Sequence, residues 1–244
     1  MEEYKDSTLD RTMIGTVQTA EGLRAFMANV FSWMTGALML TGVTAFWFAS
    51  DESLISMLID FETGGMTMLG WVVALAPLGL VILMGAAVNR LSYQALIGVF
   101  LAYSIVMGMS LSFIFLMYTA STIYTTFFIT AGTFATMAFV GYTTKTDLTS
   151  FGRILFMGLI GIILAMVVNW FLGSSQLDYI ISIIGVLIFT GLTAYDVQRL
   201  KHIGATVEHG TSIAGKAAIM GALSLYLDFI NLFLFLLRLL GGRD

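Results

Sequence analysis

The 244-residue chain is 58% hydrophobic and only 11% charged, and its mean hydropathy is +0.92. Because soluble globular domains carry about a quarter charged residues, this composition excludes a soluble domain and indicates a polytopic protein that spans a lipid bilayer. The lack of cysteine excludes disulfides, thiol catalysis and zinc–thiolate sites. The net charge of −4 is too small to be informative about nucleic acid, but no basic aromatic surface is present, so we expect no nucleic-acid partner.

The first 25 residues form a polar tail that lacks the short apolar core and the cleavage site of a signal peptide. Seven apolar runs of about 20 residues, the length that crosses a bilayer as a helix, follow at approximately 27–49, 68–88, 95–118, 121–143, 154–172, 179–198 and 215–237. We therefore predict an all-α fold with a polar tail over 1–25 and a single seven-helix transmembrane domain over 26–244.

The basic residues are distributed unevenly between the two sides of the predicted membrane domain. Nine of the eleven precede the first run or lie in the even-numbered connections, namely Lys5, Arg11, Arg24, Arg90, Lys145, Arg153, Arg199, Lys201 and Lys216. Since Lys and Arg favour the cytoplasmic side of short loops, we predict that the N-terminus and the polar tail are inside. Seven spans then place the C-terminus outside, together with Arg238 and Arg243. A six-span alternative, in which the last run is re-entrant, would place these two inside.

Small residues recur on one face of three runs, a pattern that favours close helix contacts in membranes. Ser104, Gly108 and Ser112 are spaced by four residues in the third run, and Gly161 and Ala165 are spaced likewise in the fifth. In the last run a small and polar face spans about 60° at 100° per residue and comprises Ala217, Gly221, Ser224, Asp228 and Asn231. Such a face does not suit lipid, so we predict that the last helix is central.

Asp228 places a carboxylate within the last apolar run, where a charge costs at least a few kcal/mol and indicates a functional site with a partner. The other ionisable residues in or at the edge of the runs are Arg90, Asp196 and Arg238. Arg90 and Asp196 end their runs on the inner side, so both can meet Asp228. If the last helix begins near residue 217, Asp228 lies about 16 Å deep, whereas Asp196 is much shallower. Either the sixth helix continues beyond Asp196 or the pair is offset.

If Asp196 and Asp228 come within hydrogen-bonding reach, they cannot both ionise cheaply in a low-dielectric site, so they titrate as a unit and sense protons. Arg90 offers a competing ion pair, and switching between the two partners would give two helix arrangements. The deprotonated pair of Asp196 and Asp228 is also an oxygen-ligand site for calcium, although two carboxylates fall short of the usual six to eight ligands.

Each of these residues also has an ordinary structural alternative. Asp196 can pair with Arg199 one helical turn later. Arg90 can be an anchor that extends its charge to the membrane surface. Asp228 can form a structural hydrogen bond with Asn231, with a backbone carbonyl or with another helix. The sequence leaves these alternatives open.

Three segments carry a resemblance to a known family: Gly141-Tyr-Thr-Thr-Lys-Thr-Asp-Leu148, Gly191-Leu-Thr-Ala-Tyr-Asp-Val-Gln-Arg-Leu-Lys201 and Gly221-Ala-Leu-Ser-Leu-Tyr-Leu-Asp-Phe-Ile-Asn-Leu-Phe233. From about residue 20 onward the chain resembles the Bax inhibitor-1 (transmembrane Bax inhibitor motif) family, in its bacterial inner-membrane branch. The resemblance implies two three-helix layers around the last helix. It also implies a pH-sensitive calcium leak with a di-aspartyl sensor at Asp196 and Asp228 and a latch arginine at Arg90.

Three functions compete at this stage. The leading interpretation is a pH-sensitive calcium leak channel or transporter, with calcium as the transported ion and no cofactor. The second follows from the resemblance, because some members of the family resemble regulatory partners of a membrane-bound ATP-dependent protease. The enzyme alternative is an intramembrane aspartyl protease, whose first motif Tyr195-Asp196 reproduces. Its second motif, Gly-x-Gly-Asp, is replaced by Leu225-Tyr226-Leu227-Asp228, so we predict that the chain is not an enzyme.

Overall fold

The computed structural model describes residues 2–61, 63–208 and 210–241, with side chains from residue 20 onward. Within this part of the chain, seven segments are long and apolar enough to cross a membrane. They are provided by α1 (Glu2–Ser50), α3 (Met68–Ala87), α4 (Tyr93–Leu111) with its short extension α5 (Ile114–Met117), α6 (Ala120–Thr143), α7 (Thr149–Leu172), α8 (Ser175–Thr206) and α9 (Ser212–Leu240). The predicted all-α fold with seven spans is confirmed.

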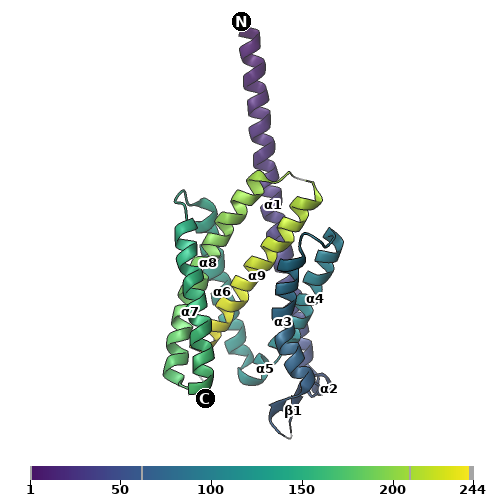
Figure 1. The fold of residues 1–244 in the computed structure, drawn as a ribbon, viewed down its shortest axis with the longest axis vertical. Coiled ribbons are helices and arrows are strands. Elements are labelled where there is room, and N and C mark those ends of the chain that lie inside the picture. The colour runs from purple at the N-terminus through teal and green to yellow at the C-terminus, as the bar shows by residue number, and fades with distance from the viewer. Residues whose placement is uncertain (1, 62, 209, 242–244) are drawn as a thin grey trace.

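The polar tail is continuous with the first span. Helix α1 runs without a break from Glu2 to Ser50, and its membrane-spanning part covers Ala20–Ser50. The N-terminal half of α1 projects well beyond the bundle (Figure 1). The tail is therefore a helical extension of the first span, while the division into two regions at residue 25 stays a prediction.

The connection between α1 and α3 contains short elements that the sequence did not predict. These are α2 (Glu52–Ile55) and a two-stranded antiparallel ribbon of β1 (Ile59–Asp60) and β2 (Gly65–Met66). Gly64, with φ of 69°, allows the tight turn between the two strands because glycine adopts the left-handed region without steric cost. The ribbon lies at the end of the bundle opposite the projecting part of α1 (Figure 1).

Helix α9 lies at the centre of the bundle, as predicted, and contacts α8, α1, α6 and α4. Two thirds (67%) of its most apolar 18 residues are buried, against 11% for α7, which covers the outside. α9 is one unbroken helix of 29 residues, about 43 Å long at 1.5 Å per residue. A re-entrant segment would turn back within the membrane, so the six-span alternative is wrong.

Hydrogen bonds join α9 to α1, and α1 to α4, deep in the bundle. The hydroxyl of Thr41 on α1 donates to the backbone oxygen of Ser104 on α4 at 2.9 Å, and it lies 2.7 Å from the hydroxyl of Tyr226 on α9. The ring of Tyr226 is fully buried and meets that of Tyr103 edge-on, with ring centroids 5.3 Å apart. These polar groups satisfy one another where water is excluded, and they fix three helices in one register.

The predicted small-residue contacts are confirmed in the third run and wrong in the fifth. A Cβ on Gly108 would lie 2.6 Å from the Cβ of Thr44, so this glycine lets α4 approach α1 closely. Gly161, in contrast, is exposed and a Cβ there would meet nothing within 4 Å. Helix α7 approaches α8 through Gly152 instead, which faces the ring of Tyr195. A four-residue spacing of small side chains did not reveal which face of α7 is buried.

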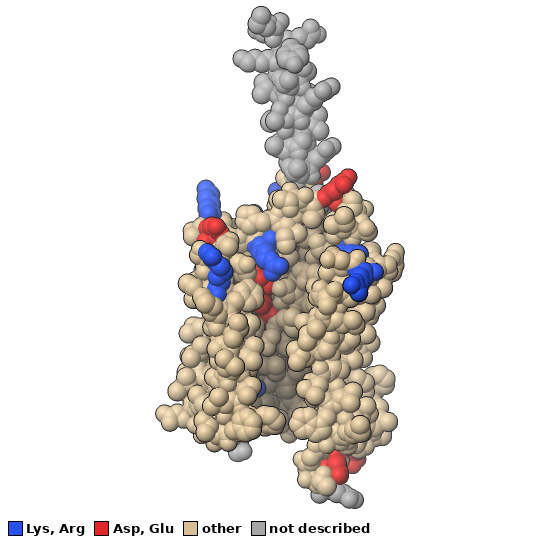
Figure 2. Space-filling model, in the orientation of Figure 1, with Lys and Arg blue, Asp and Glu red and all other residues tan. Residues whose placement is uncertain are grey.

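The basic residues with described side chains lie mostly at one end of the bundle. Figure 2 shows lysines and arginines gathered at the end from which α1 projects, and acidic residues also at the opposite end. Arg238, near the end of α9, is at that opposite end, whereas Arg243 lies outside the described residues. The positive-inside rule predicts that the basic end is cytoplasmic.

Candidate functional site

The length of α8 reduces the mismatch in depth between Asp196 and Asp228. α8 continues to Thr206, ten residues beyond Asp196, or about 15 Å at 1.5 Å per residue. Asp228 follows the first residue of α9 by sixteen residues, or about 24 Å. The remaining offset is therefore about 9 Å, and Ser224, one turn before Asp228, lies closer to the level of Asp196. Of the two alternatives left open by the sequence, the sixth helix does continue beyond Asp196, and the pair is also offset.

Asp196 is a buried carboxylate held by two side chains. It is 4% exposed, and the hydroxyl of Ser224 on α9 donates a hydrogen bond to its Oδ2. The guanidinium of Arg199, three residues later on α8, lies 3.9 Å from Oδ1, the limit for an ion pair, and Arg199 itself is 55% exposed. Oδ1 has no hydrogen-bond partner among the described residues. The alternative that Asp196 pairs with Arg199 is therefore confirmed, but Ser224 makes the closer contact.

Asp228 is buried without a fixed partner. It is 5% exposed, and its Oδ2 has no hydrogen bond to any described residue. The predicted alternative of a hydrogen bond from Asn231 is wrong, because the Asn231 amide donates to the backbone oxygen of Leu227 at 2.8 Å. No hydrogen bond joins Asp228 to Asp196 in the described chain, although both side chains line one cavity. The two acids are neighbours with unused acceptor atoms.

Two adjacent cavities lie beside these acids. The first, which we call the vestibule, has a volume of about 340 Å³ and is lined by Arg199 and Ala217, among others. The second, the acidic cavity, has a volume of about 530 Å³ and is lined by both Asp196 and Asp228. Asp196 and Ser224 line both cavities. Figure 2 shows the corresponding hollow along the middle of the bundle, with acidic atoms inside it.

The small and polar face of α9 is turned toward this space. Its members Ala217, Gly221 and Ser224 line the vestibule, and Ser224, Asp228 and Asn231 line the acidic cavity. Of these positions, Gly221 also lets the side chain of Leu200 on α8 approach the helix backbone. The face predicted from helical periodicity is therefore real, and it both lines the cavities and contacts α8.

Arg90 lies apart from the two acids in this structure. It is exposed in the turn after α3, where its backbone nitrogen donates to the oxygen of Ala87. No described acid forms an ion pair with it, and Arg199 occupies the position beside Asp196. The end of α3 is tied to the start of α9, because Lys216 Nζ donates to the oxygen of Val88 at 3.2 Å. The latch role of Arg90 stays a prediction.

The motif over residues 141–148 fastens the α6–α7 connection to α8. The side chain of Gln198 donates to the oxygen of Thr146 and accepts from the backbone nitrogen of Leu148, each at 2.8 Å. Lys201 Nζ donates to the oxygen of Tyr142 at 2.8 Å. At the start of α7, hydrogen bonds from the Thr149 side chain and backbone lower the pKa of Asp147. The motif over residues 141–148 therefore has a structural role, which is to hold the α6–α7 connection against α8.

Sequence reasoning missed two partners. Ser224 was placed on the correct face but not identified as a hydrogen-bond donor to Asp196; its position four residues before Asp228 was the available signal. Asp178 was left just outside the predicted sixth span, yet α8 begins at Ser175 and Asp178 pairs with Arg238 at 3.6 Å. No group of three or more His, Cys, Asp or Glu that could hold a metal occurs in the described ranges. Two carboxylates are too few for a resident calcium site.

Seven membrane helices around a central helix, with two buried carboxylates on a shared cavity, define a polytopic membrane protein with a polar site inside the bundle. A family model described as "Inhibitor of apoptosis-promoting Bax1" matches residues 23–244. The chain belongs to this family, the Bax inhibitor-1 family.

Several relatives resemble the chain over almost its whole length. The inner membrane protein YbhL of Escherichia coli K12 is 46% identical over 228 residues, which cover 93% of this chain and 95% of the relative. A protein of Borreliella burgdorferi is 44% identical over 218 residues, covering 89% and 92%. A protein of Rickettsia prowazekii is 42% identical over 223 residues, covering 91% and 92%.

Proposed function

We propose that the protein lets cations, with calcium as the expected cargo, cross the membrane through the acidic cavity, and that Asp196 and Asp228 make this passage depend on pH. The observation that carries the proposal is the pair of carboxylate oxygens, Oδ1 of Asp196 and Oδ2 of Asp228, that are buried without hydrogen bonds beside one cavity. Intramembrane acids with free acceptor atoms are typical of ion and proton pathways.

The chemistry of the cavity suits transient binding. Two carboxylates and the hydroxyl of Ser224 supply hard oxygen ligands, and waters must complete the shell of a calcium ion. A site with few protein ligands holds the ion loosely, which conduction requires because the ion must also leave. Protons compete for the same oxygens, so protonation of Asp196 or Asp228 removes cation ligands. Arg90 can act as a latch only in a second arrangement that brings it to the acids.

The proposed location is the bacterial inner membrane. The named relative in Escherichia coli is an inner membrane protein and aligns over 95% of its length with this chain. The gathering of basic side chains at one end supports an orientation with that end in the cytoplasm. The vestibule would then open toward the cytoplasm, because it lies between the basic end and the acidic cavity.

A non-enzymatic role is part of the proposal. The segment before Asp228 contains Leu225 and Tyr226, both fully buried. An intramembrane aspartyl protease has glycines at the positions that Leu225 and Leu227 occupy here, where they let a substrate backbone reach the second aspartate. The surroundings of Asp228 therefore favour an ion pathway over peptide hydrolysis.

Reconstitution into liposomes loaded with a calcium-sensitive dye tests the function. We expect wild-type flux to change with pH, and Asp228→Asn to lose most of this dependence because one titrating group is removed. Asp147→Asn is the matched control, since Asp147 lies at the surface in the α6–α7 connection, and it should behave like wild type.

Folded wild-type protein that shows no flux at any pH between about 6 and 8, the range around neutrality in which coupled buried acids can titrate, would refute the proposal. In that case, binding of a membrane protease that persists in Asp228→Asn would favour the role of a regulatory partner.

A further inference from the structure

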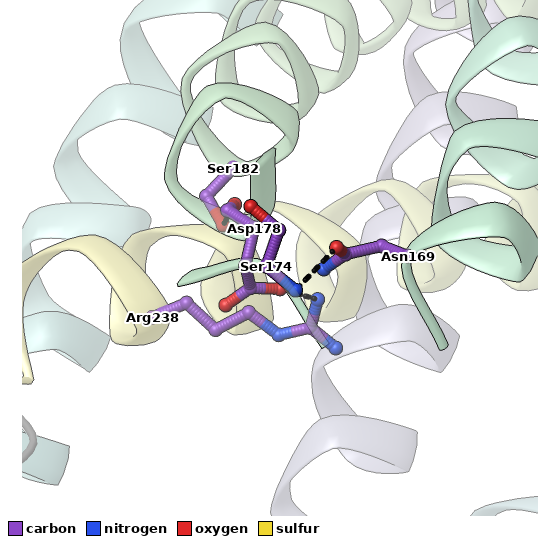
Figure 3. Close-up of polar contacts among 5 residues, drawn as sticks. All are labelled: Asn169, Ser174, Asp178, Ser182 and Arg238. Atoms are coloured by element: carbon purple, nitrogen blue, oxygen red, sulfur yellow. Dashed lines mark hydrogen bonds and ion pairs between the residues drawn. The ribbon is translucent and has the colours of Figure 1, made fainter. Parts of the chain in front are cut away.

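A second charged pair lies at the end of the bundle opposite the basic residues. Arg238, in the last turn of α9, lies with its guanidinium 3.6 Å from Asp178 in the first turn of α8. Figure 3 shows the Arg238 side chain reaching across to Asp178, with Asn169 and Ser174 beside it. Both charged side chains are only partly exposed, 39% for Arg238 and 28% for Asp178.

This pair stands on the same face of α9 as the acidic cavity. A cavity of about 400 Å³, which we call the far cavity, is lined by Arg238 and Asp178 and shares Met166 and Leu234 with the acidic cavity. Four positions of α9 that line the three cavities are spaced by seven residues, namely Ala217, Ser224, Asn231 and Arg238. Seven residues are nearly two helical turns, so one stripe of α9 lines the vestibule, the acidic cavity and the far cavity in succession.

Asp178 is fixed more firmly than Arg238. Its backbone oxygen accepts from the Ser182 hydroxyl at 2.8 Å, and it lies in the first turn of α8, whose partial positive charge favours a carboxylate. The preceding connection is held because the backbone nitrogen of Ser174 donates to Oδ1 of Asn169 at 3.1 Å. Arg238 has a long flexible side chain that rests 5.7 Å from the ring centroid of Phe235. A partly exposed ion pair is weak, so Arg238 can leave Asp178 while Asp178 stays in place.

We propose that Arg238 and Asp178 form a charge-selective gate at the far end of the path. While the pair is formed, Asp178 neutralises the guanidinium and cations can pass into the acidic cavity. When Arg238 leaves Asp178, its guanidinium turns into the far cavity apart from the carboxylate, and its positive charge there repels cations. The gate rests on the proposed function, because it regulates access to the same acidic cavity.

The charges of the pair can be removed one at a time with opposite expected effects. Asp178→Asn leaves the positive charge of Arg238 and should hinder cations. Arg238→Gln leaves the negative charge of Asp178 and should admit them more readily. The double variant Asp178→Asn with Arg238→Gln should admit cations at a rate near that of the wild type. Arg238→Lys, which keeps the charge, should remain within about twofold of the wild-type rate.

Cysteine labelling tests this gate without any measurement of calcium flux. The chain has no cysteine, so Leu234→Cys supplies a single thiol at the junction of the acidic and far cavities. Membrane-impermeant methanethiosulfonates of either charge are added to the side on which Ser56→Cys, an exposed position in the connection next to the ribbon, reacts. We expect the ratio of cationic to anionic labelling rates to rise at least about fivefold in Arg238→Gln and to fall at least about fivefold in Asp178→Asn, as a local charge focuses ions of opposite sign.

Several outcomes would overturn the gate. One is a ratio of cationic to anionic labelling rates that agrees within about twofold in the wild-type, Arg238→Gln and Asp178→Asn backgrounds. Another is the absence of labelling of Leu234→Cys from the side on which Ser56→Cys reacts. Asn231→Cys, on the same stripe, replaces Leu234→Cys if the latter does not fold. Charge-dependent labelling in a protein without calcium flux would keep the gate and reject the proposed cargo. Calcium flux that depends on Asp228, together with labelling that does not depend on charge, would keep the proposed function and reject the gate.

Discussion

Replacement of Ser224 by alanine removes the one hydrogen bond that joins α9 to the Asp196 carboxylate. Asp196 is 4% exposed and its other oxygen has no hydrogen-bond partner among the described residues. After the substitution Asp196 keeps only Arg199, at 3.9 Å and 55% exposed. Water from the vestibule can replace part of the lost contact, because Asp196 and Ser224 both line that cavity. We therefore expect a moderate loss of stability.

The expected size of this loss follows from the energies of comparable hydrogen bonds in soluble and in membrane proteins. A hydrogen bond to a charged group contributes about 1.5–3 kcal/mol in soluble proteins, whereas polar contacts between membrane helices average about 0.6 and reach about 1.7 kcal/mol. Membrane values are lower because the unfolded helices also find partners in the bilayer. For Ser224→Ala we expect a decrease of about 1–2 kcal/mol in the free energy of unfolding, near the top of the membrane range because a buried carboxylate loses its donor.

The assay is reversible unfolding in mixed micelles, with a double-mutant cycle of Ser224→Ala and Asp196→Ala. We expect a coupling energy of about 1 kcal/mol between the two positions. Ser182→Ala is the matched control, because the buried Ser182 hydroxyl donates to the oxygen of Asp178 in its own helix and joins no second helix. A coupling energy below about 0.3 kcal/mol, the level at which independent sites are additive, would show that the hydrogen bond does not join the two helices.

Two further substitutions test the contacts that position the site. Gly141→Ala places a Cβ 2.8 Å from the Cα of Ala194 and should lower the free energy of unfolding by about 1–3 kcal/mol. The control is Gly161→Ala, whose Cβ meets nothing within 4 Å and which should be neutral or stabilising by up to about 1 kcal/mol. Similar thermal midpoints for both variants would contradict the close approach of α6 to α8. Gln198→Leu loses both hydrogen bonds to the α6–α7 connection, so it should lower the free energy of unfolding by about 1–3 kcal/mol and speed proteolysis of this connection. Gln198→Glu keeps one acceptor, so its stability and cleavage rate should be intermediate. An unchanged cleavage rate in Gln198→Leu would show that Gln198 does not hold the connection.

The surroundings of Asp228 show which features of the site the sequence pattern could not predict. Helical periodicity placed Ser224, Asp228 and Asn231 on one face, and that face lines the cavities. Periodicity could not show that Asn231 donates to the backbone of its own helix, so that none of the described residues donates to Asp228. Which side chain satisfies which polar group depends on rotamers and on the neighbouring helices, and neither is encoded in the spacing along one helix.

The sequence by itself determined the class of protein, the seven spans and the central position of α9, and it singled out the two acids that line the acidic cavity. These follow from local properties, because the bilayer demands about 20 apolar residues for each span and makes every intramembrane charge conspicuous. Only the tertiary structure decided that Ser224 donates to Asp196, that Arg90 stands apart, and that Asp178 pairs with Arg238. Those contacts join different helices or depend on where a helix ends, and both are set by the packing of the whole bundle.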